Sequence, residues 1–235
     1  DGRIAARDGK ASPVPPKRYP ERLFETVHIP PSLSEKDFAI PCQAAQALCR
    51  VIDLIPDQII NREAREWFSV RDGLIPADPE RDLLKLSVVE RYGKNGRVSS
   101  AFVRGFRLTS GALASSVSHD HHNIVVVGSN DHDMLLAARE LERLQGGFAC
   151  VYDGEVKASA ALPLGGLMSS LPAPEVMAQM DCVNHAAAEL GCQMAAPFMT
   201  LSFISLPTVP ELGLTDMGLI DVLAHQICPL ILETK

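Results

Sequence analysis

The chain has 235 residues, of which 46% are hydrophobic and 22% are charged, a balance typical of a soluble globular protein. Its net charge of −7 argues against a nucleic-acid partner, because phosphate binding requires a basic face. No apolar run reaches the roughly 18 residues of a membrane span, so no membrane partner is expected. Six cysteines without a C-x-x-C pair favour buried thiols in a reducing cytoplasm over disulfides or a zinc site.

The first 33 residues predict two segments outside the main domain. Residues 1–12 contain two Asp-Gly turns around a short strand, which predicts a small hairpin. Residues 13–33 are rich in proline, which predicts an extended linker that resists packing into a core. The main domain is therefore expected to span residues 34–235, with Ser34 and Asp37 capping a short turn at its entrance.

Several apolar or alternating runs predict strands in this domain. They are expected at residues 50–55, from 59–60 onward, and at 66–70, 83–90, 100–108, 111–117, 124–128, 148–152 and 155–162. A further apolar run at residues 198–206 predicts a final strand.

Two helices are predicted among these strands. One follows Asn130 or Asp131, either of which can cap it, and ends at Gly146-Gly147. The other runs from about Ala173 to Leu190, with a proline in its first turn. The mixture of hairpins and strand–helix–strand units predicts an α+β or mixed α/β fold, in which about two long helices pack on a mixed sheet.

The polar run at residues 118–123 lies between two runs that predict buried strands. Titratable side chains in such a position carry a desolvation cost, which a site that binds a metal or moves protons would explain. If the run is extended, the H-x-H spacing of His119 and His121 puts both imidazoles on one face, and Asp120 could orient a neighbouring ring. The alternative is a polar loop in which backbone carbonyls satisfy the histidines.

A second candidate is the turn that contains Gly165 and Gly166, between a predicted strand and a predicted helix. Such a turn can hold an anion or the edge of a substrate, although the sequence favours a plain connecting turn between strand and helix over this interpretation. It lacks the G-x-G-x-x-G pattern of dinucleotide-binding sites. The serines at 115, 116 and 118 lack the G-x-S-x-G pattern of a hydrolase nucleophile.

A series of stretches in chain order carries a family resemblance. They are residues 78–82 with 89–91, 114–128, 130–134, 163–169, 197–203, 210–216 and 218–222. Together they resemble the C-terminal domain of bacterial-type adenine deaminases of the amidohydrolase superfamily, over nearly all of residues 37–223. Residues 1–10 are similar to the last hairpin of the small β-sandwich that flanks the catalytic barrel in that superfamily.

The resemblance implies a full-length enzyme that hydrolyses adenine to hypoxanthine and ammonia in purine salvage. Its divalent metal, manganese or iron, would lie in a barrel of the same polypeptide and supply the attacking hydroxide. This chain lacks the eight strand–helix units of a barrel, so it is expected to be inactive alone and to hold no metal. The resemblance also implies a homodimer or another homo-oligomer.

The family motif further implies which residues serve the active site. His119, Asp120 and His122 match it and are expected to act in catalysis at the mouth of the barrel, with Asn123 binding substrate. Met168 and Ser169 are expected to contact substrate as well. The family usually has a small residue in place of His121, and Gly-Phe-Gly where this chain has residues 105–107 ending in arginine. Two alternatives remain: a structural or dimerisation domain, and an autonomous metal-binding module.

Overall fold

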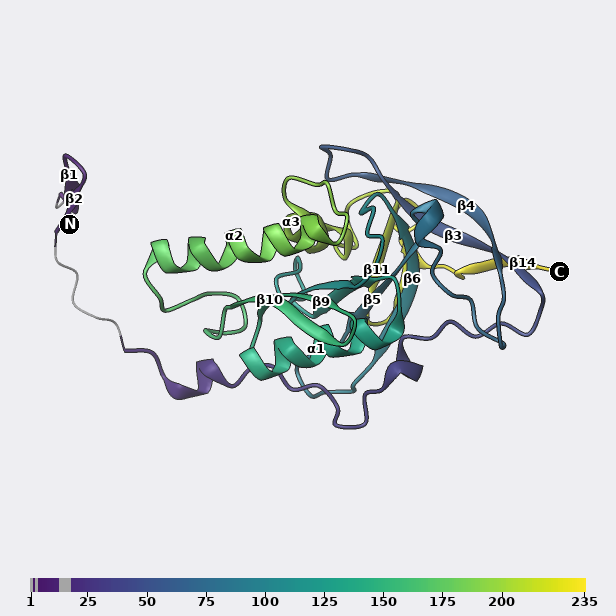
Figure 1. Ribbon diagram of the computed structural model, residues 1–235, viewed down its shortest axis with the longest axis horizontal. Coiled ribbons are helices and arrows are strands. Elements are labelled where there is room, and N and C mark those ends of the chain that lie inside the picture. The colour runs from purple at the N-terminus through teal and green to yellow at the C-terminus, as the bar shows by residue number, and fades with distance from the viewer. Residues whose placement is uncertain (1, 3, 13–17) are drawn as a thin grey trace.

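Figure 1 shows the computed structural model, which describes residues 2, 4–12 and 18–235. Across these residues the main sheet has nine strands, in the order β10-β9-β7-β8-β5-β6-β3-β14, with β4 paired to β3. Only the β3–β6 pair is parallel among them. The strands are β3 Gln46–Leu54, β4 Asn61–Ser69, β5 Leu84–Val89, β6 Val98–Arg104, β7 Ala112–Ser115, β8 Ile124–Gly128, β9 Gly147–Tyr152, β10 Glu155–Ala161 and β14 Ile231–Thr234.

Helices cover both faces of this sheet (Figure 1). They are α1 Asp131–Leu144, α2 Ala173–Glu189 and α3 Pro197–Ile204. Side chains that alternate along β8 enter two separate cores: Val125 and Val127 pack with α2 and α3, whereas Ile124 and Val126 pack with α1. This is the two-residue period of a strand buried on both faces. The mixed sheet and its packed helices confirm the predicted α+β class.

Helix α1 begins as predicted, because the Asn130 side chain accepts a hydrogen bond of 2.8 Å from the backbone N–H of Asp133. The predicted final strand at residues 198–206 is wrong, since this run forms α3 and Pro197 occupies its first turn. A short apolar run fits a buried helix as well as a buried strand, and periodicity alone does not distinguish them. No helix in the described part of the chain is long and apolar enough to cross a membrane.

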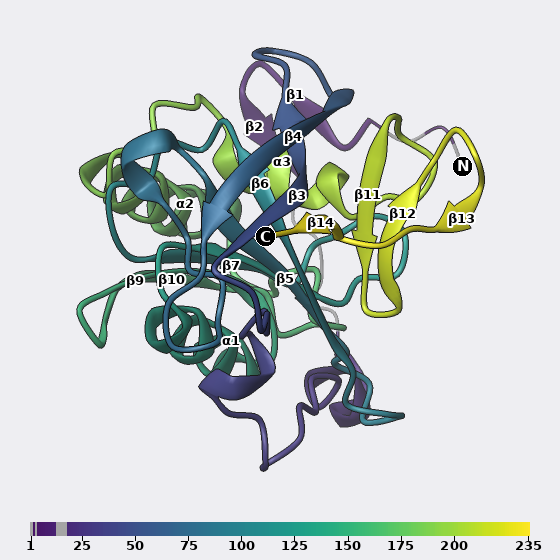
Figure 2. The same ribbon diagram turned by 90° about the vertical axis from the view of Figure 1, so that its right-hand side faces the viewer.

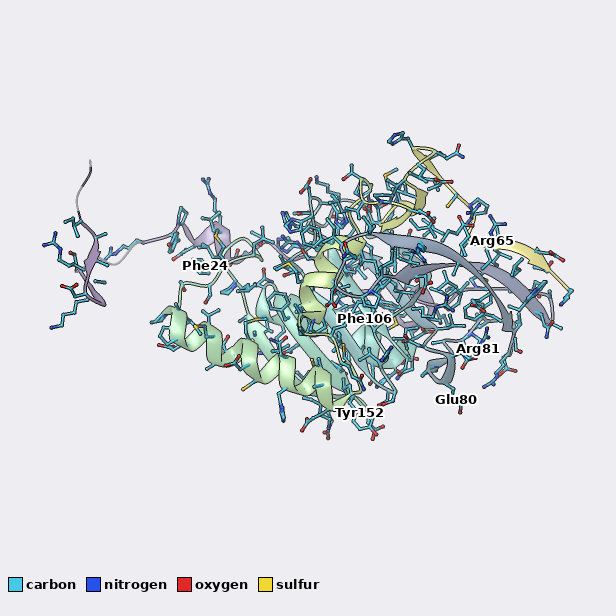
Figure 3. All side chains as sticks on the ribbon, turned by 90° about the horizontal axis from the view of Figure 1, so that it is seen from above. Phe24, Arg65, Glu80, Arg81, Phe106 and Tyr152 are labelled. Atoms are coloured by element: carbon cyan, nitrogen blue, oxygen red, sulfur yellow. The ribbon has the colours of Figure 1, made fainter. Side chains whose placement is uncertain are left out.

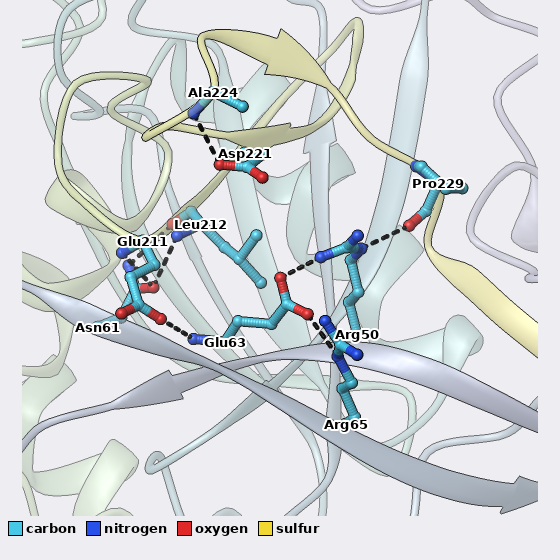
Figure 4. A network of polar contacts seen from close by, with 9 residues as sticks. All are labelled: Arg50, Asn61, Glu63, Arg65, Glu211, Leu212, Asp221, Ala224 and Pro229. Atoms are coloured by element: carbon cyan, nitrogen blue, oxygen red, sulfur yellow. Dashed lines mark hydrogen bonds and ion pairs between the residues drawn. The ribbon is translucent and has the colours of Figure 1, made fainter.

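A second, three-stranded sheet lies beside the main one (Figure 2). Its strands are β11 Leu212–Thr215, β12 Gly218–Asp221 and β13 Gln226–Ile227. The side chain of Asn61, at the start of β4, donates to the carbonyl of Leu212 at 2.8 Å and accepts from its N–H at 3.0 Å (Figure 4). The Glu63 N–H donates to the Glu211 carboxylate at 2.7 Å. These bonds fix the β11–β12 hairpin, which contributes to the candidate site.

The N-terminal hairpin consists of β1 Ala6–Arg7 and β2 Lys10–Ala11, joined at an Asp-Gly turn as predicted. The other Asp-Gly pair begins at Asp1, which lies outside the described residues. The later part of the expected linker packs closely, because Val27 and Ile29 are buried against α1 with only 1% and 4% exposure. Glu142 on α1 accepts the N–H of Ile29 at 3.0 Å, so apolar burial and a polar anchor overcome the effect of the neighbouring prolines.

Two short 3₁₀ helices lie in this N-terminal segment, η1 Glu21–Phe24 and η2 Glu35–Asp37, and a third, η3 Pro79–Arg81, precedes β5. The predicted cap is confirmed, since Ser34 and Asp37 form a reciprocal capping box at η2. Figure 3 shows Phe24 towards the N-terminal end and the fully buried Phe106 in the middle of the main body.

Candidate active site

The histidine loop, residues 118–123, connects β7 to β8 and folds back on itself. The Ser118 hydroxyl donates to the carbonyl of Asn123 at 2.7 Å, and the His122 N–H donates to the carbonyl of Ser118 at 2.8 Å. The extended H-x-H arrangement is therefore wrong. A turn separates the histidines, and each imidazole has its own surroundings.

Helix α3 holds two of the histidines through carbonyl oxygens near its C-terminal end. The His119 N–H donates to the carbonyl of Ser202 at 2.8 Å, and the His119 ring centroid lies 4.8 Å from that of Phe203. His121 Nε2 lies 3.2 Å from the carbonyl of Ser205. The last carbonyls of a helix lack partners within the helix, so this end of α3 offers acceptors to the loop.

His121 has partners at both ring nitrogens. The backbone N–H of Asn123 donates to Nδ1 at 3.0 Å, so Nδ1 carries no proton and Nε2–H donates to Ser205. Burial lowers the pKa of His121, which favours this neutral form. His121 therefore fits the alternative prediction, a polar loop in which backbone groups form hydrogen bonds with the histidine. This arrangement leaves it no ring nitrogen for a metal.

His119, Asp120 and His122 are held differently from His121. The His119 side chain is 36% exposed and that of Asp120 is 91% exposed, with His119 Nδ1 and Asp120 Oδ1 separated by 3.9 Å. The ring centroids of His119 and His122 are 6.0 Å apart. Nδ1 of His122 is buried and has no hydrogen-bond partner among the described residues. Burial lowers the pKa of His122, so a neutral imidazole with an unused nitrogen stands beside an exposed acid.

Asn123 is buried and its amide is engaged within the chain. Its Oδ1 accepts from the backbone N–H of Arg91 at 3.3 Å, and its Nδ2 donates to Asp216 in the β11–β12 hairpin at 3.1 Å. Only 4% of the residue is exposed. The side chain therefore ties three segments together and has one amide hydrogen left for any other partner.

The glycine turn, residues 163–169, lies next to the histidine loop. The Ser116 hydroxyl, just before the loop, donates to the carbonyl of Gly166 at 2.6 Å. Met168 is 58% exposed, and Ser169 Oγ accepts from the Leu171 N–H at 3.1 Å. Among the hydrogen bonds of the described residues, none joins the side chains of Met168 or Ser169 to the histidine loop.

Several residues of this site were not predicted from the sequence. They contact the histidine loop from three other segments and are Arg91, Tyr92, Phe203, Ser205 and Asp216. The stretches 89–91, 197–203 and 210–216 belong to the family resemblance, which was the only signal pointing toward three of them.

No group of three or more His, Cys, Asp and Glu side chains within residues 2, 4–12 and 18–235 could hold a metal ion. The arrangement instead suits proton transfer and hydrogen bonding, because a neutral imidazole and a carboxylate stand together at a partly open position. A cleft of about 790 Å³ includes Phe203 and Met199 in its wall but none of the histidines.

Residues 58–226 match the protein family described as "Adenine deaminase C-terminal domain". A curated protein named "Adenine deaminase" from Desulforamulus reducens is 57% identical over 236 residues, covering 100% of this chain and 40% of the relative. Proteins of the same name from Dehalococcoides mccartyi (strain BAV1) and Moorella thermoacetica are 43% and 42% identical over 97% and 98% of this chain. The chain spans about two fifths of the length of these relatives.

Proposed function

Because the chain belongs to the adenine deaminase C-terminal domain family, we propose that it forms the C-terminal part of an enzyme that hydrolyses adenine to hypoxanthine and ammonia. The identity of 57% over the whole chain to a protein of that name supports this activity for the full-length polypeptide. The chain alone is proposed to be inactive, since the catalytic barrel would come from the rest of the polypeptide.

We further propose a cytoplasmic setting in purine salvage. All six cysteines are free, and burial raises the pKa of Cys49 and Cys150 to about 12. Such thiols are protonated and unreactive at neutral pH, which suits a compartment where thiols stay reduced.

The divalent metal, proposed to be manganese or iron, is assigned to the missing barrel. The H-x-H pair does not fit it, because both nitrogens of His121 are occupied by Asn123 and Ser205. A barrel-bound metal would activate the attacking water, and the residues of this chain would act around it.

The proposed role of the histidine loop is to face the mouth of the barrel, with His119, Asp120 and His122 in contact with the purine or the leaving amine. One observation carries this proposal: Nδ1 of His122 is buried without a partner in residues 2, 4–12 and 18–235, and the same loop holds a partly exposed imidazole and an exposed carboxylate. Unpartnered buried polar atoms are rare in stable folds, and a neutral imidazole can accept or pass on a proton.

The remaining predicted site residues differ in their contacts and exposure. Asn123 supports the loop through Arg91 and Asp216, and we propose that its free amide hydrogen is its only route to substrate. Met168 is exposed and offers an apolar surface that suits a purine face, with Ser169 beside it. Their role depends on how the barrel covers the glycine turn.

The test is steady-state kinetics of the full-length enzyme with adenine, comparing His119→Ala and His122→Ala with the control His132→Ala. His132 lies at the other end of β8 and is 62% exposed, paired to Glu35 at 2.8 Å. Both loop variants are expected to lose turnover by roughly 100-fold or more, as removal of a general acid or base does. Kinetics close to wild type in both would contradict the proposal.

A structural role in dimerisation is the second candidate. Met217, Leu223 and Ile227, in and around the small sheet, are 60%, 68% and 57% exposed. Exposed apolar side chains close together in the chain suit an interface between copies. Sedimentation of full-length Leu223→Lys would test this: a monomer that still deaminates adenine would favour the structural role for this sheet.

A further inference from the structure

Arg91, two residues after the end of β5, is a fully buried cation with no carboxylate partner among the described residues. Only 1% of the residue is exposed, and it forms no ion pair with another described residue. Its Nη1 also lacks a hydrogen-bond partner among them. Burial lowers the pKa of Arg91. Buried charges are normally paired, and an unpaired one opposes folding.

The hydrogen-bond acceptors of Arg91 are backbone carbonyls on two different loops, and its guanidinium carbon lies 5.0 Å from the centroid of the Tyr92 ring. Nε donates to the carbonyl of His122, and Nη2 donates to the carbonyl of Gly165 at 3.1 Å. A Cβ atom on Gly166, whose φ is +73°, would lie 1.9 Å from Nη1, so only glycine leaves room for the guanidinium there. The guanidinium therefore sits between the histidine loop and the glycine turn, the two segments that the sequence predicts to carry site residues.

The segment around Arg91 is held firmly. The Glu90 carboxylate accepts four backbone N–H bonds, from Tyr92 at 2.6 Å and, at 3.0–3.1 Å, from Lys94, Asn95 and Gly96. Burial opposes ionisation of Glu90, but these bonds outweigh it and lower the pKa. The Tyr92 hydroxyl donates to the carbonyl of His121 at 2.6 Å.

A second arginine shows what an ordinary structural arginine looks like in this fold. Arg139 on α1 also donates to backbone carbonyls, those of Pro30, Pro31 and Leu33. Its side chain is 28% exposed and pairs with Glu142 at 2.9 Å. Arg91 also donates to carbonyls, but it is buried and has no carboxylate partner among the described residues. Departures from the usual pairing of buried charges concentrate at functional sites.

We propose that Arg91 is a positioning residue that fixes the histidine loop against the glycine turn and orients His122 for the deamination reaction. The inference rests on the proposed function of the loop. The planar fork of arginine suits two carbonyls at a fixed angle, which a lysine ammonium reproduces poorly. The positive charge of Arg91 also disfavours protonation of the His122 imidazole, as does His119. The Asp120 carboxylate acts in the opposite direction and favours the protonated form.

The experiment measures kcat and KM for adenine across the pH range in which histidine titrates, in the full-length enzyme. The variants are Arg91→Gln and Arg91→Lys, with Arg139→Gln as the matched control. Arg91→Gln is expected to lower kcat by 10- to 100-fold, the range typical of residues that orient a reactive group, with a smaller change in KM. The acidic limb of its pH–kcat profile should move to higher pH, because loss of the positive charge makes His122 easier to protonate.

Arg91→Lys separates geometry from charge. It should lose kcat through the missing fork but keep the acidic limb near its wild-type position, and Arg139→Gln should change neither. Wild-type kcat and pH profile in both Arg91 variants would overturn the inference. If Arg91→Gln does not fold, a wild-type kcat in Arg91→Lys is by itself enough to overturn the inference. Wild-type turnover in both His119→Ala and His122→Ala would instead remove the proposed function of the loop, so the two failures are distinguishable.

Discussion

The two ends of strand β8 both carry clusters of polar residues, but they satisfy them differently. After β8, Asn130 caps α1, Asp131 pairs with Lys85 at 2.7 Å, and Asp133 accepts the Gly154 N–H at 2.9 Å. Around the loop before β8, Nδ1 of His122 and Nη1 of Arg91 are buried without hydrogen-bond partners in the part of the chain that the structure describes.

On the proposed function, this difference separates polar groups that stabilise the fold from those available for chemistry. Each of the polar groups named at the far end has a partner within the chain, which is how buried polar groups usually contribute to stability. The histidine loop and the adjoining Arg91 keep a buried imidazole nitrogen and a buried guanidinium nitrogen without partners among the described residues, and both oppose folding. The acid of this loop, Asp120, is exposed. We therefore expect substitutions after β8 to change stability and substitutions before it to change turnover.

The largest effect on stability is expected for Asp131→Ala. The Lys85 side chain is only 4% exposed, so loss of its carboxylate leaves a buried, unpaired ammonium. Such a loss costs about 3 kcal/mol, at the lower end of the usual range because Asp131 is 21% exposed. Denaturant unfolding of the full-length protein measures it, and turnover of the folded variant should match wild type. Loss of turnover without loss of stability would reverse the assignment of the two ends.

Asp120→Asn is the matched change in the histidine loop. We expect kcat/KM for adenine to fall about tenfold, equivalent to about 1.4 kcal/mol, because the exposed carboxylate no longer stabilises charge on the neighbouring imidazoles. Its 91% exposure predicts an unchanged unfolding midpoint. Unchanged kinetics together with a lowered midpoint would make Asp120 a structural residue.

Asn130→Ala should cost about 1 kcal/mol of stability, since it removes the side-chain cap of α1. The cap was evident in the sequence, because a capping residue followed by helical spacing is a local pattern. The prediction is checked by the unfolding midpoint, and replacement by aspartate, which also caps, should restore stability. Equal stability of the alanine and aspartate variants would remove the cap as a contributor.

What could be predicted from the sequence depends on whether an interaction is local or distant in the chain. The hairpin turns at residues 8–9 and 153–154, the α1 cap and most of the predicted strands depend on neighbours in the chain, and these predictions are confirmed. The two strands predicted from 59–60 and at 66–70 instead form one strand, β4. The sequence predicts a strand where helix α3 forms, because an apolar run of that length has no period that distinguishes the two. Arg91 and the His121–Ser205 contact join segments 31 and 84 residues apart, which no local pattern indicates.

The smallest effect is expected for His121→Gln, as a change in pH dependence. Burial lowers the pKa of His121 in the folded state below 6.5, so the unfolded state binds more protons as the pH falls through 6.5. Stability should therefore decrease on acidification below that value, and glutamine, which does not titrate there, should remove part of the decrease. The measurement is the unfolding midpoint against pH, and identical curves for both proteins would contradict a neutral His121.

The central claim is that the segment before β8 belongs to the active site and the segment after it does not. A structure of the full-length enzyme with a bound purine tests this most directly. The account predicts His119 and His122 at hydrogen-bond distance, about 3 Å, from the purine or its attacking water, with Asp131 and His132 remote from it. A histidine loop that faces solvent, separated from the purine by other side chains, would contradict it.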